Sequence, residues 1–178
     1  SYFVSLIGER IHKTFFTNSK LNIQKVSSVN SKSKTSGEWI YDICITSQQE
    51  ITDSRYKGTS FVNTNILFAC ESEFETSIAA FATDFGKLLC SNANQILYIQ
   101  GLSQSTEQGR LDFIESRKKI VTTQLNNLIK DDFVLAFIPT PGKIRDGSFW
   151  DTHHNTVIAW AEIWIYDKSK NEFFKFNS

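Results

Sequence analysis

Two stretches of this chain follow the period of a helix, and each lies between short runs that have the composition of β-strands. In the first stretch the apolar residues recur on one helix face: Ile78, Phe81, Phe85, Leu88 and Leu89. In the second stretch the apolar stripe comprises Phe113, Ile114, Ile120, Val121, Leu125 and Leu128. A chain that alternates strands with helices places its strands in a sheet and its helices on the faces of that sheet. We therefore predict an α/β fold with a mixed central sheet flanked by helices.

The strand-like runs are rich in β-branched and aromatic residues, which pack well on a pleated surface. They cover residues 37–47, 61–75, 95–102 and 133–141, with a further candidate near residues 21–29. Residues 157–167 and 172–176 are expected to form a C-terminal β-hairpin across the polar segment DKSKN.

The remaining segments complete the predicted order of elements. Residues 3–15 predict an amphipathic helix, whereas the polar residues 48–60 predict a turn or hairpin loop. Thr76 or Ser77 is expected to cap the helix that follows, and Ser105 with Gln108 forms a candidate capping box for the long helix.

The composition indicates one globular domain over residues 1–178. Hydrophobic residues make up 40% of the chain, and the formal net charge is zero, so the chain is not a polycation. The charge is nevertheless uneven. Residues 1–37 carry six Lys or Arg against the single acid Glu9, and residues 38–86 carry eight acids against Arg55 and Lys57. This division suits a protein that holds phosphate with one region and a cation with the other, or it reflects two solvated surfaces.

The three cysteines show no paired spacing and are expected to be small buried hydrophobes in a reducing compartment: Cys44, Cys70 and Cys90. No apolar run reaches the length of a membrane span, and the first residues lack the pattern of a signal peptide. We therefore predict a cytoplasmic protein with no membrane partner.

Three carboxylates form the most informative constellation in the sequence. Glu71 and Glu73 lie two residues apart at the end of a predicted strand, so they project from the same face. Asp42 lies inside the preceding apolar strand, where a carboxylate is costly unless it is paired, protonated or bound to a metal. If the two strands are neighbours, the three side chains converge at a site suited to Mg²⁺ or Mn²⁺. Alternatively, Glu71 and Glu73 form a solvated strand end, and Asp42 caps a turn or pairs with Arg55.

Asp42 in EWIYDICI and Glu71 and Glu73 in FACESEF, followed by a helix and a strand, give an arrangement that resembles the PD-(D/E)XK nuclease superfamily. The resemblance covers roughly residues 1 to 137 as an order of elements. It implies a restriction-endonuclease-like core, in a Glu-x-Glu variant that some restriction endonucleases share. It also implies that Asp42 and Glu71 hold a divalent ion and that Glu73 stands where most members have a Lys that orients the attacking water. Glu9, in the first helix, lies where many members place an additional acidic ligand.

The sequence departs from that pattern at two positions. Tyr41 replaces the usual Pro, and Glu73 replaces the usual Lys, for which Lys87 of the next helix is a candidate substitute. The expected function is a Mg²⁺- or Mn²⁺-dependent nuclease that hydrolyses DNA phosphodiester bonds, either as a monomer or as a homodimer. The alternative is a non-catalytic binding or regulatory module that retains a nuclease-like fold.

Two further groups of residues have weaker interpretations. His153 and His154 lie in a polar loop and are expected to form the loop or contact substrate rather than to build a metal site. Arg117, Lys118 and Lys119 are expected on a solvated face of the long helix, where they could touch phosphate.

Overall fold

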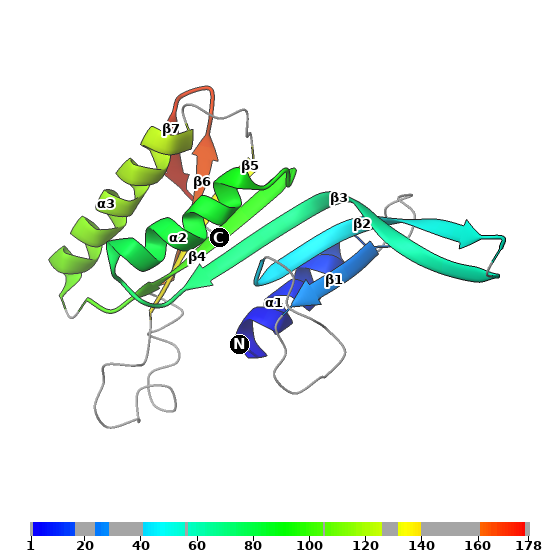
Figure 1. Cartoon of the computed structure of the whole chain (residues 1–178). Coiled ribbons are helices and arrows are strands. Elements are labelled where there is room, and N and C mark those ends of the chain that lie inside the picture. Colours follow the sequence, from blue (N-terminus) through cyan, green and yellow to red (C-terminus); the bar gives the residue numbers. More distant parts are fainter. Residues whose placement is uncertain are drawn as a thin grey trace. The chain divides into compact units, whose positions relative to one another are not determined.

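The computed structural model describes residues 2–16, 24–28, 41–55, 57–104, 106–125, 132–139 and 161–176 (Figure 1). The fold is α/β with a mixed sheet, as predicted. The chain divides into two compact units, the first comprising Ser1–Glu71 with Cys90–Ile96 and the second comprising Ser72–Leu89 with Leu97–Ser178. The single domain expected from the composition stays a prediction.

The first unit contains a helix and an antiparallel meander. Its elements are α1 (Tyr2–Ile11), a π-helical turn (His12–Phe16), β1 (Gln24–Ser28), β2 (Ile43–Asp53) and most of β3 (Gly58–Glu73). β1 pairs with the first part of β2, and β2 pairs along its whole length with β3. α1 lies so close to the sheet that a Cβ at Gly8 would come within 2.9 Å of the Ile43 side chain. The helix predicted near the N-terminus and the strand predicted near residues 21–29 are confirmed.

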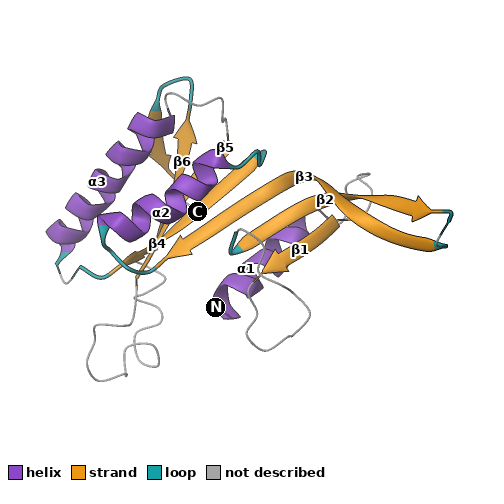
Figure 2. Cartoon of the chain, viewed as in Figure 1, coloured by secondary structure: helices purple, strands orange, loops and turns teal. Residues whose placement is uncertain are grey.

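The β2–β3 hairpin is longer than the sequence predicted (Figure 2). Residues 48–60 were expected to form a turn or hairpin loop. The chain does turn there, but Gln48–Asp53 and Gly58–Ser60 are strand residues, so the turn is much shorter than expected. The described turn residues are Ser54, Arg55 and Lys57, and Lys57 adopts a left-handed φ of 51°. The hairpin therefore has a buried base, at Ile43–Ser47, and an exposed ribbon beyond it.

Cross-strand polar contacts explain why this ribbon is a strand pair although its residues are polar. The Thr46 hydroxyl and the Gln48 side-chain amide both donate to Asn63 Oδ1, at 3.1 and 2.8 Å. Ser47 Oγ and Thr64 Oγ1 lie 2.9 Å apart. The pairing register also skips Leu67 and Thr64, which marks two β-bulges, one within the buried base and one where the ribbon begins. Because such contacts depend on the register, the polarity of the sequence alone does not reveal them.

The second unit combines helices with the remaining strands. Its elements are α2 (Ile78–Cys90) up to Leu89, β4 (Gln95–Leu102) from Leu97 onward, α3 (Glu107–Leu125), β5 (Asp132–Pro139), β6 (Glu162–Asp167) and β7 (Glu172–Lys175). Within the sheet these strands follow the order β4-β5-β6-β7. β6 and β7 pair as an antiparallel hairpin, which confirms the predicted C-terminal hairpin.

Aromatic rings fill the space between the helices and the strands of this unit. Phe85 of α2 contacts Phe133 of β5 edge to face, with ring centroids 5.9 Å apart. Phe113 of α3 contacts Phe137 of the same strand at 6.4 Å. Phe133 and Phe137 are four residues apart on β5 and thus share a face, so both helices pack on one face of that strand.

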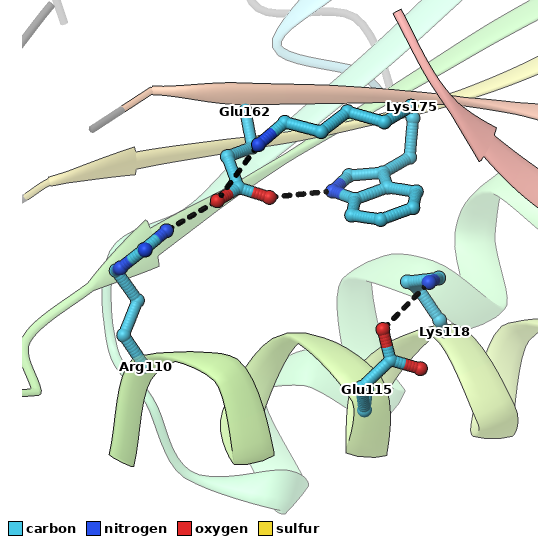
Figure 3. Close-up of polar contacts among 6 residues, drawn as sticks. Arg110, Glu115, Lys118, Glu162 and Lys175 are labelled. Carbon is cyan, nitrogen blue, oxygen red and sulfur yellow. Dashed lines mark hydrogen bonds and ion pairs between the residues drawn. The ribbon is translucent and has the colours of Figure 1, made fainter. Parts of the chain in front are cut away.

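A buried carboxylate ties α3 to the C-terminal hairpin (Figure 3). Glu162 of β6 is 5% exposed and binds Arg110 of α3 and Lys175 of β7, the latter at 3.2 Å. Its second oxygen accepts a hydrogen bond from Trp164 Nε1 at 3.1 Å. Lys118 of α3 lies 3.5 Å from the centre of the Trp164 ring and pairs with Glu115 at 2.7 Å. These contacts fix the helix against the hairpin by charge as well as by packing.

The helix caps were predicted with partial success. Ser77 caps α2, since its hydroxyl accepts a hydrogen bond from Ala80 N at 3.2 Å. The long helix begins one residue later than expected, because Thr106 Oγ1 accepts from Gly109 N at 3.1 Å. Ser105, the first residue of the predicted capping box, lies outside the described residues. Among the described residues, none of the helices combines the length and apolar character that a membrane span needs.

Candidate functional site

Asp42 and Glu71 come together at the base of the β2–β3 hairpin, within the first unit. β2 and β3 are antiparallel neighbours, and the last pair of their register is Ile43 with Cys70. Asp42 directly precedes Ile43 and Glu71 directly follows Cys70, so both carboxylates adjoin the last pair of the two strands. The expectation that these two strands are neighbours is confirmed, although Asp42 occupies a bend just before β2 and not the strand itself.

Glu71 is almost completely buried, with 2% of its surface exposed, and Asp42 is half-buried. The charges of both carboxylates affect the pKa of the same thiol, that of Cys70. Burial raises the pKa of Cys70 well above its usual range, and the charges of Asp42 and Glu71 raise it further. The two carboxylates therefore lie within electrostatic reach of one sulfur atom, which agrees with the register of the strands.

Tyr41 and Ser91 lie beside this pair. Burial raises the pKa of the Tyr41 hydroxyl, and the neighbouring Cys44 and Glu71 add to the shift, while a hydrogen bond with Ser91 opposes it. Tyr41 is 5% and Ser91 3% exposed, so Glu71 has buried neighbours on its own unit. In the PD-(D/E)XK superfamily, which the sequence resembles, this position is usually Pro. Here Tyr41 occupies it and packs as part of the core.

Glu73 is the last residue of β3 and belongs to the second unit. Its Oε1 accepts a hydrogen bond from the backbone nitrogen of Glu75 at 2.6 Å. The carboxylate is therefore oriented by the turn that follows the strand. The expected role of Glu73 beside an attacking water stays a prediction.

Glu9 is exposed on α1. Nowhere in the described ranges do three or more His, Cys, Asp or Glu residues form a group that could hold a metal ion. The predicted Mg²⁺ or Mn²⁺ site at Asp42 and Glu71, with Glu9 as an additional ligand, stays a prediction.

The alternative pairing of Asp42 with Arg55 does not fit the hairpin. Asp42 and Arg55 lie beyond opposite ends of β2, whose 11 residues run from Ile43 to Asp53. At the usual rise per residue the strand is about 35 Å long, far beyond the reach of an ion pair. Instead, the backbone nitrogen of Arg55 donates to Asp53 Oδ1 at 2.8 Å.

The structure describes only some of the other candidate functional residues. Lys20, Lys32 and Lys34 of the basic N-terminal region lie outside the described residues, as do His153 and His154. Lys87 pairs with Asp84 on its own helix at 2.7 Å. Cys90 is exposed, so the expectation that all three cysteines are buried is wrong for this residue.

Two buried polar residues were not predicted from the sequence. Arg117 was expected on a solvated helix face, but it is 5% exposed and lies over the rings of Phe81 and Phe113, at 4.8 and 4.6 Å. Its position could have revealed this, because 117 is three residues after Ile114 and four before Val121 on the apolar stripe. Gln100 is fully buried in β4, and a lone amide inside an apolar strand was the available signal.

The fold and the carboxylate pair thus define an α/β protein with a candidate acidic site. Comparisons with protein-family models, with curated proteins and with solved structures found no significant match for this chain. The resemblance to the PD-(D/E)XK superfamily therefore continues to rest on the residues and on the order of the elements.

Proposed function

We propose that this protein is a divalent-metal-dependent nuclease that hydrolyses DNA phosphodiester bonds, with Asp42 and Glu71 as its metal ligands. The observation that supports the proposal is the position of these carboxylates, which adjoin the last pair of two neighbouring strands and both raise the pKa of Cys70. The succession α1, β1, β2, β3, α2, β4 supports it, because it is the order of elements that the resemblance implies.

Two carboxylates suit the proposed ion. Mg²⁺ in proteins keeps several waters and is bound through one or two carboxylates together with substrate phosphates. A third protein ligand is therefore not required for such a site. When bound, the ion would supply positive charge to the phosphoryl oxygens and lower the pKa of a coordinated water.

The side chains have separate tasks in this proposal. Asp42 and Glu71 supply hard oxygen ligands, and the burial of Glu71 restricts the directions in which that carboxylate can turn. Glu73, two residues further along β3, is assigned to orient the attacking water and accept its proton, in place of the Lys usual in the resembling family. The backbone nitrogen of Glu75 already holds one oxygen of Glu73, which leaves the other oxygen for this role.

Asp42→Asn tests the proposal directly. The full chain is incubated with long genomic duplex DNA in Mg²⁺ or Mn²⁺, and cleavage is followed on gels with a chelator control. The variant should lose cleavage by at least about 100-fold, since Asn keeps the shape of Asp but loses the charge that holds the ion. Asp53→Asn is the matched control, because it makes the same chemical change at the exposed end of the same strand and should cleave like the wild type.

A thermal melt separates the proposal from a purely structural role for Asp42. If Asp42 and Glu71 hold an ion, Mn²⁺ should raise the melting temperature of the wild type but not of Asp42→Asn. Without metal the variant should melt at the same or a higher temperature, because clustered carboxylates repel one another. Destabilisation by about 1 to 3 kcal/mol would instead indicate that Asp42 satisfies a buried partner. That result, with no cleavage by the wild type, would leave the alternative of a binding or regulatory module.

A further inference from the structure

The backbone segment Glu73–Thr76, between β3 and α2, is held by side chains from two other elements of the second unit. Gln100 of β4 donates both hydrogens of its amide, to the carbonyl oxygens of Glu73 at 2.8 Å and Glu75 at 3.2 Å. Arg117 of α3 donates to the carbonyl oxygen of Thr76 at 2.8 Å. Three carbonyls within four consecutive residues therefore accept from two side chains distant in sequence.

Both donors are expensive to bury. Gln100 is 0% and Arg117 5% exposed, and burial lowers the pKa of the Arg117 guanidinium. Gln100 Oε1 and Arg117 Nε have no hydrogen-bond partner within the described part of the chain. Leaving buried polar atoms unsatisfied carries a desolvation cost that an apolar core residue would avoid. Packing alone therefore does not favour a glutamine and an arginine at these positions.

The same segment orients the side chain of Glu73. Glu75 N donates to Glu73 Oε1 at 2.6 Å, so the carboxylate folds back onto the turn that follows its own strand. Gln100 binds the carbonyls of Glu73 and Glu75, the two residues that this hydrogen bond joins. Removing the Gln100 amide would therefore loosen both ends of the turn that fixes the carboxylate.

We infer that Gln100 and Arg117 are positioning residues for Glu73 in phosphodiester cleavage, an inference that rests on the proposed function. They do not touch substrate. Gln100 fixes the turn at Glu73 and Glu75, and Arg117 fixes its exit into α2 at Thr76. Replacing a residue that holds a reacting group in place without touching the substrate typically lowers activity by about 10- to 100-fold.

The test compares Gln100→Met with Ile99→Val in the full chain. Met retains the length of Gln without its hydrogen bonds, whereas Ile99→Val perturbs the neighbouring buried residue of β4 without touching the segment. Gln100→Met should lower kcat by about 10- to 100-fold and leave KM for duplex DNA within about threefold. Hydrogen exchange should be faster at the amides of residues 74–77 in Gln100→Met than in Ile99→Val. Equal exchange and equal kcat in the two variants would overturn the inference.

A double-mutant cycle checks that Gln100 acts through Glu73. The 10- to 100-fold effect should shrink to about onefold when Gln100→Met is introduced into Glu73→Gln, because the group being positioned is already lost. Effects that multiply independently would overturn the inference.

Substitutions of Arg117 provide a second test of the inference if Gln100→Met folds poorly. Arg117→Lys keeps a cationic donor for the Thr76 carbonyl and should retain more kcat than Arg117→Met, and equal losses would contradict the positioning role. If the wild type cleaves and both Gln100→Met and Arg117→Met cleave as fast, the inference fails while the proposed function stands. If the wild type itself fails to cleave, the proposed function fails first and the assignment of Glu73 fails with it.

Discussion

The β2–β3 hairpin of the first unit and the β6–β7 hairpin of the second are both antiparallel, but different chemistry holds each one. Beyond its buried base, the β2–β3 hairpin is an exposed ribbon whose strands are joined by neutral side chains such as Gln48 and Asn63. The β6–β7 hairpin is covered by α3 and bound to it through the ionised Glu162, Arg110 and Lys175. An exposed ribbon thus relies on contacts across its own strands, whereas a covered hairpin uses charge to fix a neighbouring helix.

The largest expected effect tests whether the β2–β3 hairpin depends on its base. Ile45 is fully buried and Ile51 is 51% exposed, although both lie on β2. Ile45→Ala should lower the free energy of unfolding by about 2 to 5 kcal/mol, because it removes buried methyl groups and leaves a cavity. Ile51→Ala should change it by less than about 0.5 kcal/mol. Urea denaturation of both variants measures the contrast, and similar losses would show that the ribbon is more buried than described.

The second prediction concerns the charged hairpin. Glu162→Gln should lower the free energy of unfolding by about 2 to 3 kcal/mol, since Arg110 loses its anionic partner, with the exposed Lys175 adding little. Burial acts to raise the pKa of Glu162, but the hydrogen bonds from Arg110 and Lys175 outweigh it, so the pKa is lower than usual. A carboxylate with a lowered folded-state pKa contributes stability above its unfolded pKa, and that stability is lost as the pH falls through the folded pKa.

The pH dependence provides the control for this prediction. The difference in unfolding free energy between the wild type and Glu162→Gln should shrink as the pH is lowered from about 6 to about 3. Glu172→Gln makes the same change at an exposed position of β7 and should cost less than about 0.5 kcal/mol. A pH-independent difference would mean that the shape of Glu162, and not its charge, holds the hairpin.

The smallest expected effect lies in the ribbon. Asn63→Ala removes the acceptor of Thr46 and Gln48 and should cost about 0.5 to 1.5 kcal/mol, measured by urea denaturation. Because those partners are neutral, the cost should be the same at low salt and in about 1 M NaCl, whereas exposed ion pairs weaken as salt screens them. A strong salt dependence of the Asn63→Ala effect would remove the contrast between the two hairpins.

The sequence predicted those elements whose pattern depends on burial. The helical spacing of Phe81, Phe85 and Leu88 identified α2, because one face of that helix packs against the core. The apolar runs around Ile43 and Phe68 located the buried base of the hairpin and hence the neighbouring strands of Asp42 and Glu71. A buried face places apolar residues at regular intervals in the sequence, and these predictions were made from those intervals.

The sequence did not predict structure that depends on particular partners. The ribbon at 48–60 has no apolar alternation, and its strands are joined by contacts that only the register defines. Arg117 looked like a surface cation because its neighbours Lys118 and Lys119 are charged, although the helical phase places it inside. The hydrogen bonds of Gln100 to the segment after β3 join residues 25 and 27 positions apart. Such pairings require the three-dimensional arrangement before they can be recognised.

The three cysteines differ in a way that has a practical consequence. Burial raises the pKa of Cys44 to about 11 and that of Cys70 well above its usual range, so both remain protonated and shielded from reagents at neutral pH. Cys90 is exposed at the end of α2 and close enough to Tyr41 for its charge to act on that hydroxyl. Of the three cysteines, Cys90 is therefore the accessible attachment point for a fluorophore or spin label, and a label there would report spectroscopically on the surroundings of Tyr41 without introducing or removing any cysteine.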